Sequence, residues 1–139
     1  MKDRIKCLLI TPLSEDFLPL RRLIAEALQE SGIEPALLEE ELSAESASPE
    51  PIVERVSKAI GRADFIIADL TGSNPNVMYE VGLAHAMRKP VLFILQRNLQ
   101  HSIPFDLRHQ LIYFYDPSAP PDLMRDGIKK WVWLNQKAA

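Results

Sequence analysis

Four short apolar runs stand out along the 139-residue chain, each bounded by polar or turn-forming residues. They lie at residues 5–10, 65–68, 91–95 and 111–115. Runs of this length are typical of strands buried on both faces of a parallel sheet. A weaker strand is predicted at residues 34–38, where Pro35 favours a place at the sheet edge because it cannot donate to a ladder.

Between these runs, apolar residues recur every three or four positions, which predicts helices with one face on the sheet. The predicted helices lie at about residues 17–28, 51–60, 75–88 and 121–134. Gly32 and Gly61 are expected to end the first two, and Lys89-Pro90 the third. On the last helix the inner side is predicted to carry Leu123, Met124, Ile128, Trp131, Val132 and Leu134.

Strands that alternate with helices indicate an α/β fold in which helices cover both faces of a parallel sheet. We expect one domain over residues 1–139, a three-layer sandwich whose five-stranded sheet has the flavodoxin-like order 2-1-3-4-5. Residues 96–107 form a long polar connection before the last strand. Residues 43–51 are predicted to be a mobile loop that could cover a site.

Composition and charge narrow the classes of partner. The net charge is −3 and no Lys/Arg cluster stands out, which argues against a nucleic acid polymer or an anionic membrane. The single cysteine, Cys7, excludes an intrachain disulfide and is expected to be a small core residue. No signal-peptide pattern and no apolar stretch of roughly 18 residues is present, so the expected location is the cytoplasm.

Several common motifs are missing. The five glycines form neither a dinucleotide fingerprint nor a P-loop, and His85, His101 and His109 lack metal-site spacing. We therefore expect no metal and no cofactor. A phosphoacceptor receiver domain shares the strand order, but Thr11-Pro12-Leu13 stands where its acidic pair would follow the first strand.

The most informative stretch is residues 63–87, a strand, a polar turn and a helix. Open parallel sheets bind ligands just outside the carboxyl ends of their strands, where Asp69 lies. Asp64 begins the same strand and so lies at the opposite edge of the sheet. Gly72 permits a sharp turn, and Asn74 is either a helix cap or a ligand contact.

Glu80 lies in the second turn of this helix, among largely apolar neighbours. If it is partly desolvated, its pKa rises and it can serve as a nucleophile or general base; the alternative is a solvated glutamate. Two readings also remain for Glu39-Glu40-Glu41: a solvated strand end, or a carboxylate that contacts a ribose.

The stretch ADFIIADLTGSNPNVMYEVGLAHAMRKPVLFI, with the later IPFDLRHQLIYFYD, resembles the bacterial nucleoside 2-deoxyribosyltransferase-like proteins, whose superfamily is related in fold to TIR domains. The resemblance implies that Glu80, with Gly82 and Ala84, matches the nucleophile that attacks the anomeric carbon. It also implies that Asp69 matches the strand-end aspartate that interacts with the leaving base. At the second acidic position this chain has Asn74, which can hydrogen-bond but cannot act as an acid.

The candidate catalytic residues are thus Glu80 and Asp69. The candidate substrate contacts are Thr11, Pro12, Leu13, Gly72, Asn74, Asn76 and Arg108. For Ile103 to Arg108 we expect an anchored loop with Phe105 and Leu107 buried, or else Arg108 on a phosphate.

The resemblance implies a small-molecule nucleoside or nucleotide as partner, and leaves three functions open. These are N-glycosidic hydrolysis or transfer, a non-catalytic TIR-like nucleotide-sensing or self-association module, and cleavage of NAD by a TIR-like enzyme. By the same analogy we expect a homo-oligomer, at least a dimer, with Met78, Tyr79 or Met87 at its interface.

Overall fold

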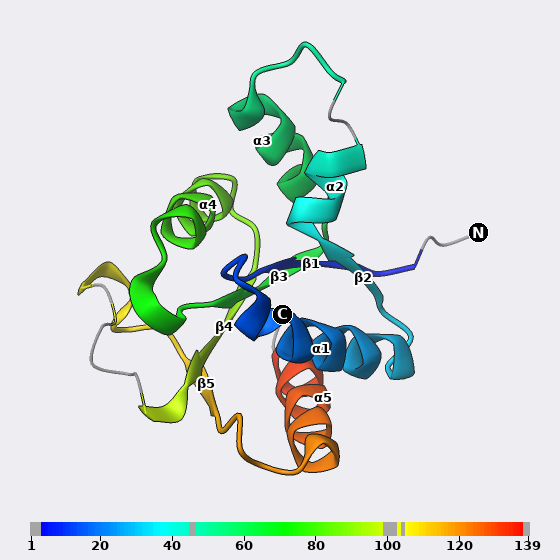
Figure 1. Ribbon diagram of the computed structural model, residues 1–139, viewed down its shortest axis with the longest axis vertical. Coiled ribbons are helices and arrows are strands. Elements are labelled where there is room, and N and C mark those ends of the chain that lie inside the picture. Colours follow the sequence, from blue (N-terminus) through cyan, green and yellow to red (C-terminus); the bar gives the residue numbers. More distant parts are fainter. Residues whose placement is uncertain (1–3, 45–46, 99–102, 104, 138–139) are drawn as a thin grey trace.

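The computed structural model describes residues 4–44, 47–98, 103 and 105–137. Five parallel strands form one sheet in the order β2-β1-β3-β4-β5, which confirms the predicted order (Figure 1). The strands are β1 (Lys6–Ile10), β2 (Glu34–Leu37), β3 (Phe65–Asp69), β4 (Val91–Gln96) and β5 (Ile112–Tyr115). Pro35 lies in β2 at the edge of the sheet, as predicted.

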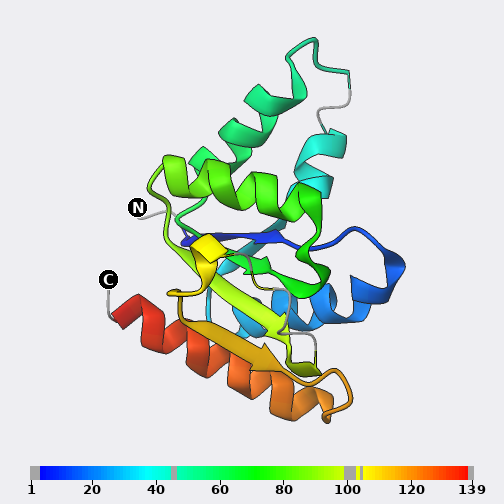
Figure 2. The ribbon, with the colours of Figure 1, turned by 90° about the vertical axis from the view of Figure 1, so that its left-hand side faces the viewer.

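Helices cover both faces of the sheet and complete the three layers (Figures 1 and 2). One face carries α1 (Leu18–Glu30) and α5 (Pro121–Lys137). The other face carries α2 (Leu38–Ala44), α3 (Ile52–Arg62) and α4 (Pro75–Ala86). Alternate residues of the central strands feed the two cores: Leu8 and Ile66 pack under α3 and α4, whereas Cys7 and Ile67 pack against α1 and α5.

Three helix predictions need correction. Gly61 does not end its helix, since α3 continues to Arg62; Gly32 does end α1, with a left-handed φ of 75°. Glu39, Glu40 and Glu41 form the first turn of α2 rather than a solvated strand end, because buried Leu38 anchors the turn and acidic residues suit a helix N-terminus. On α5, Leu123 and Leu134 are 65% and 46% exposed and therefore lie off the inner face.

The connection from β4 to β5 differs from a regular strand-helix-strand unit. In its described part the helical structure after residue 98 is the short 3-10 turn η4 (Phe105–Leu107), which agrees with the long polar connection expected at residues 96–107. Leu107 is buried and Ile103 packs on the core, which supports the predicted anchored loop. Arg108 is exposed. For Phe105 the side chain is outside the described part, as are residues 45–46 of the predicted 43–51 loop.

Within the described ranges, none of the helices has the length and apolar character needed to span a bilayer.

Candidate functional site

The carboxyl ends of β1 and β3 lie beside the start of α4 (Figure 2). After Asp69 the chain turns through the 3-10 segment η2 (Thr71–Ser73) and enters α4 at Pro75. Gly72 has a φ of 76°, a conformation that side-chain-bearing residues rarely adopt, so glycine suits this turn. The turn thus fixes the start of α4 and, through it, the position of Glu80.

Asp69 is fully buried and fully engaged. Its Oδ1 accepts a hydrogen bond of 2.9 Å from the backbone N–H of Thr71, and its Oδ2 accepts one of 2.6 Å from the Tyr115 hydroxyl. The Thr71 hydroxyl lies 3.2 Å from that of Tyr115 and accepts from the Gln96 N–H at 2.9 Å. Burial raises the pKa of Asp69, and these hydrogen bonds oppose the shift. The network ties together the ends of β3, β4 and β5.

Asn74 is the N-cap of α4. Its Oδ1 accepts hydrogen bonds from the backbone N–H groups of Asn76 at 2.9 Å and Val77 at 3.3 Å. Pro75 occupies the first helical position, where its missing N–H costs nothing. The structural reading of Asn74 is therefore correct, and its amide nitrogen is the part left to face a ligand.

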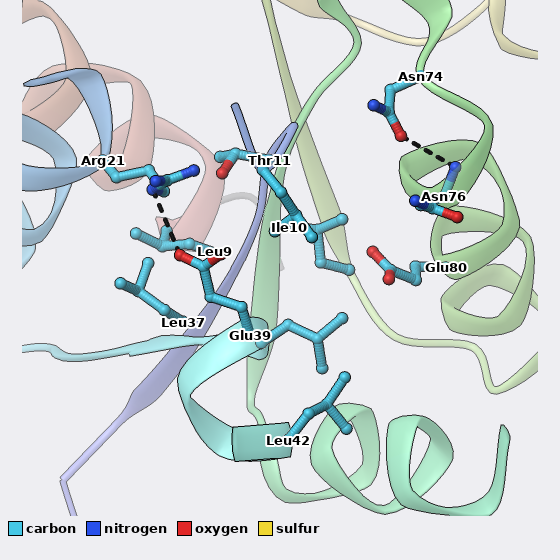
Figure 3. A pocket seen from close by; sticks show the side chains of 12 residues that line it. Leu9, Ile10, Thr11, Arg21, Leu37, Glu39, Leu42, Asn74, Asn76 and Glu80 are labelled. Atoms are coloured by element: carbon cyan, nitrogen blue, oxygen red, sulfur yellow. Dashed lines mark hydrogen bonds and ion pairs between the residues drawn. The ribbon is translucent and has the colours of Figure 1, made fainter. Parts of the chain in front are cut away.

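A cavity of about 100 Å³ opens between the end of β1, the start of α2 and α4. Figure 3 shows Glu80 on one side of it and Arg21 and Glu39 on the other, with Ile10 and Thr11 between them. Leu9, Leu13, Leu37, Leu38 and Leu42 supply apolar walls, and Asn74 and Asn76 lie on the α4 side. The site therefore combines an apolar slot with a few polar groups, as ligand sites commonly do.

Glu80 has the electrostatic character expected of a working carboxylate. It is half-buried in this cavity, and burial raises its pKa from 4.5 to about 7. Near neutral pH it therefore exists in both its ionised and its protonated form. A carboxylate with such a pKa can attack an electron-poor carbon or exchange a proton, and perturbed values of this kind gather at functional sites.

Arg21 was not among the predicted site residues, and Glu39 was considered only as part of the 39–41 run, whose second reading was a carboxylate that contacts a ribose. Sequence periodicity places Arg21 on the polar side of α1, yet it is only 6% exposed. Its Nη1 donates to the Pro12 carbonyl at 2.8 Å, and its Nε lies 3.6 Å from Glu39 Oε1. The sequence gives no direct sign that Arg21 turns inward. It could have been found only by supposing that the loop after β1 needs a side-chain donor for a backbone carbonyl such as that of Pro12.

A second hollow of about 520 Å³ adjoins the first at Asn74. Pro12, Thr71, Gly72 and Gln96 are among its lining residues. It gives a ligand bound at Glu80 room to extend along the carboxyl edge of the sheet.

The predicted residues separate into three groups. Thr11, Leu13, Asn74, Asn76 and Glu80 line the first cavity, and Pro12 and Gly72 line the second hollow. Asp69 and Arg108 line neither; Asp69 lies beneath the turn and Arg108 is beyond η4. Asp64 lies at the opposite edge of the sheet, where its Oδ2 accepts from the Lys6 N–H at 2.7 Å.

Among the described residues, no group of three or more His, Cys, Asp or Glu side chains is arranged to hold a metal ion. The interface prediction stays open: Tyr79 and Met87 are exposed, whereas Met78 packs partly on the core.

The fold is shared with solved structures of nucleoside-processing enzymes. A Clostridium botulinum CMP N-glycosidase, BcmB, superposes with a TM-score of 0.54 at 17% identity, covering 94% of this chain and 98% of that one. A 2-deoxyribosyltransferase from Bacillus psychrosaccharolyticus gives 0.57 at 14% identity, covering 87% and 90% of the two chains. A Leishmania mexicana 2-deoxyribosyltransferase gives 0.55 at 14% identity, covering 88% and 97%.

Among curated protein sequences, none matches this chain. The family model described as nucleoside 2-deoxyribosyltransferase matches residues 14–125, which is well over half of the sequence and includes α1, the turn at Gly72 and Glu80. The chain therefore belongs to the nucleoside 2-deoxyribosyltransferase family.

Proposed function

We propose that this protein cleaves or transfers the N-glycosidic bond of a nucleoside or nucleotide, with Glu80 as the nucleophile. The observation that carries the proposal is the half-buried Glu80, with a pKa near 7, in an apolar cavity at the carboxyl edge of the sheet. Family membership supports glycosyl transfer or cleavage as the class of reaction.

In the first step, a Glu80 carboxylate oxygen forms a bond to the anomeric carbon as the C–N bond breaks. The bonding electron pair leaves with the base nitrogen, which takes a proton from water. In the second step, water or the ring nitrogen of another base attacks the same carbon and releases the Glu80 carboxylate, losing its own proton to solvent. Because the attacked carbon gains oxocarbenium character, the nearby carboxylate also stabilises the transition state electrostatically.

Only ionised Glu80 can attack, so the rate is expected to rise with pH through about 7 and then level off. Asn74 and Asn76 line the same cavity as Glu80, and the proposal gives them the role of hydrogen-bonding the sugar. For Asp69, direct contact with the base requires the Thr71 turn to open, because the carboxylate is buried; its simpler role in this proposal is to hold the turn.

The test incubates the protein with ribonucleosides, deoxyribonucleosides, their 5′-monophosphates and NAD, and follows free base or nicotinamide by chromatography. Glu80→Gln is expected to lower the rate by about 10³-fold or more, since Glu39, the other carboxylate of the cavity, lies on its opposite side and cannot replace the nucleophile. A glycosyl adduct on the intact chain, detected by mass spectrometry and absent from Glu80→Gln, supports the covalent step. Glu40→Gln, which alters an exposed glutamate of α2 outside the cavity, is the matched control.

A second candidate is a nucleotide-binding module without turnover. It is favoured by the engagement of the two other candidate residues of the strand-turn-helix stretch: Asp69 in its buried network and Asn74 in the helix cap. Calorimetry with the same compounds separates the two. Binding without product supports the module, release of base supports the enzyme, and no binding by any compound contradicts both.

A further inference from the structure

Glu39 faces the cavity from the side opposite Glu80 (Figure 3). We infer that Glu39, held in place by Arg21, contacts the base of the nucleoside and selects bases that carry an exocyclic amino group. This inference rests on the proposed function, because it takes Glu80 to mark the position of the sugar.

Arg21 is fixed more firmly than Glu39. The arginine is 6% exposed and anchored by its bond to the Pro12 carbonyl, and its Nε has no hydrogen-bond partner within the described structure. Glu39 Oε1 lies 3.6 Å from that Nε, too far for a hydrogen bond but near enough for charge attraction. The Glu39 side chain is 33% exposed. The pair thus holds a carboxylate at the cavity surface with unused acceptor capacity.

The reaction geometry places the base on the Glu39 side. A nucleophile approaches the anomeric carbon from the face opposite the bond that breaks, so the base departs away from Glu80. Leu37, Leu38 and Leu42 give this side an apolar wall that suits the flat face of a heterocycle, whereas Asn74 and Asn76 lie on the α4 side. The edge of a base in this slot meets Glu39.

A carboxylate accepts hydrogen bonds but cannot donate them. An amino group, as in adenine or cytosine, can donate to Glu39. In hypoxanthine or uracil a carbonyl oxygen takes the same position and meets the carboxylate oxygen, which leaves two acceptors face to face. A site built to bond one group rejects the analogue that cannot pair, because its own polar atoms are then left unsatisfied.

The experiment measures dissociation constants by calorimetry for adenosine against inosine and for cytidine against uridine. Glu80→Gln serves as the background, since the nucleosides then stay intact, and the unsubstituted chain is measured in parallel. We expect at least one amino nucleoside to bind about tenfold or more tightly than its oxo partner. Adding Glu39→Gln should reduce that preference to about threefold or less, because an amide can pair with either group.

Glu40→Gln is the matched control and should keep the preference, since Glu40 lies on the same helix but outside the cavity. Arg21→Lys keeps the charge but loses the fork that holds Pro12 and Glu39, so it should weaken the preference. Circular dichroism checks that each variant is folded. If Arg21→Lys is not folded, the comparison of Glu39→Gln with Glu40→Gln tests the inference on its own.

Binding that shows no amino preference, or a preference that survives Glu39→Gln, overturns the assignment of Glu39 and leaves the proposed function standing. If none of the four nucleosides binds even to the unsubstituted chain, the assignment of Glu39 falls, whereas the proposed function falls only if the deoxyribonucleosides, the 5′-monophosphates and NAD also fail to bind.

Discussion

Two carboxylates on either side of the Gly72 turn have opposite surroundings. Asp69 and Glu80 both lose water on folding, and burial raises the pKa of each. Asp69 receives hydrogen bonds from Thr71 and Tyr115, which offset part of the effect of burial. For Glu80, burial is the sole cause of the shift. The difference separates an aspartate that is hydrogen-bonded within the fold from a glutamate whose pKa is shifted by burial alone, as the proposed nucleophile requires.

Asp69 and Glu80 belong to one strand-turn-helix stretch but contribute to it differently. The buried network holds the ends of three strands and the turn between them, so α4 starts from a fixed point. The cavity side then presents Glu80 from the second turn of a capped helix. A preorganised site requires both features: a rigid support, here the Asp69 network, and a charged group that the protein itself does not neutralise, here Glu80.

Asp69→Ala should have the largest effect and lower the free energy of unfolding by about 3–5 kcal/mol, because it leaves the Tyr115 hydroxyl and the Thr71 N–H buried without their acceptor. Urea unfolding measures the change. Asp64→Ala, directly before the first residue of the same strand, is the control and should cost much less. Equal losses at the two positions would contradict a special role for the buried network.

Tyr115→Phe removes one donor to Asp69 and should lower the free energy of unfolding by about 1–3 kcal/mol. Tyr113→Phe on the same strand, where the ring packs on Trp131, should cost less. The two variants are compared by thermal and urea unfolding. If Tyr115→Phe is as stable as the unsubstituted chain, the hydroxyl does not support Asp69.

Glu80→Gln should stabilise the protein at pH 8 by about 1–2 kcal/mol, after allowance for solvent screening of a half-buried group. Its pKa is higher in the folded chain, about 7 against 4.5, so ionisation opposes folding as the pH rises through that interval. Below pH 4.5 the carboxyl is protonated in both states and the gain vanishes. Urea unfolding at pH 5 and 8 checks this; a gain that does not grow with pH would show that Glu80 is not desolvated.

Substitutions of Asn74 should give the smallest change in the free energy of unfolding, and two of them together test its role as a helix cap. Asn74→Ala should lower the free energy of unfolding by about 1 kcal/mol through loss of the cap, whereas Asn74→Asp should stay within about 0.5 kcal/mol because aspartate caps equally well. Thermal unfolding compares the two. Should both cost the same, the oxygen of Asn74 does not act as a cap.

Much of the fold follows from local patterns. The apolar runs of β1, β3 and β4 predicted the central strands. Gly32 predicted the end of α1, and the structure gives it the left-handed φ that this role requires. The helix α2 was missed because the three adjacent glutamates in its first turn show no helical period. Its anchor, the buried side chain of Leu38, can be recognised only in the structure.

The sequence by itself predicted the strands and helices and the place of Glu80 on its helix, because apolar period and turn residues act locally, and general topology rules then gave the sheet order and the edge that carries the candidate site. Only the tertiary structure decided that Asp69 is buried under Tyr115, that Arg21 turns inward to the Pro12 carbonyl, and that Glu39 faces Glu80 across the cavity. These outcomes depend on contacts between residues far apart in the chain, whose hydrogen bonds and desolvation no local pattern contains.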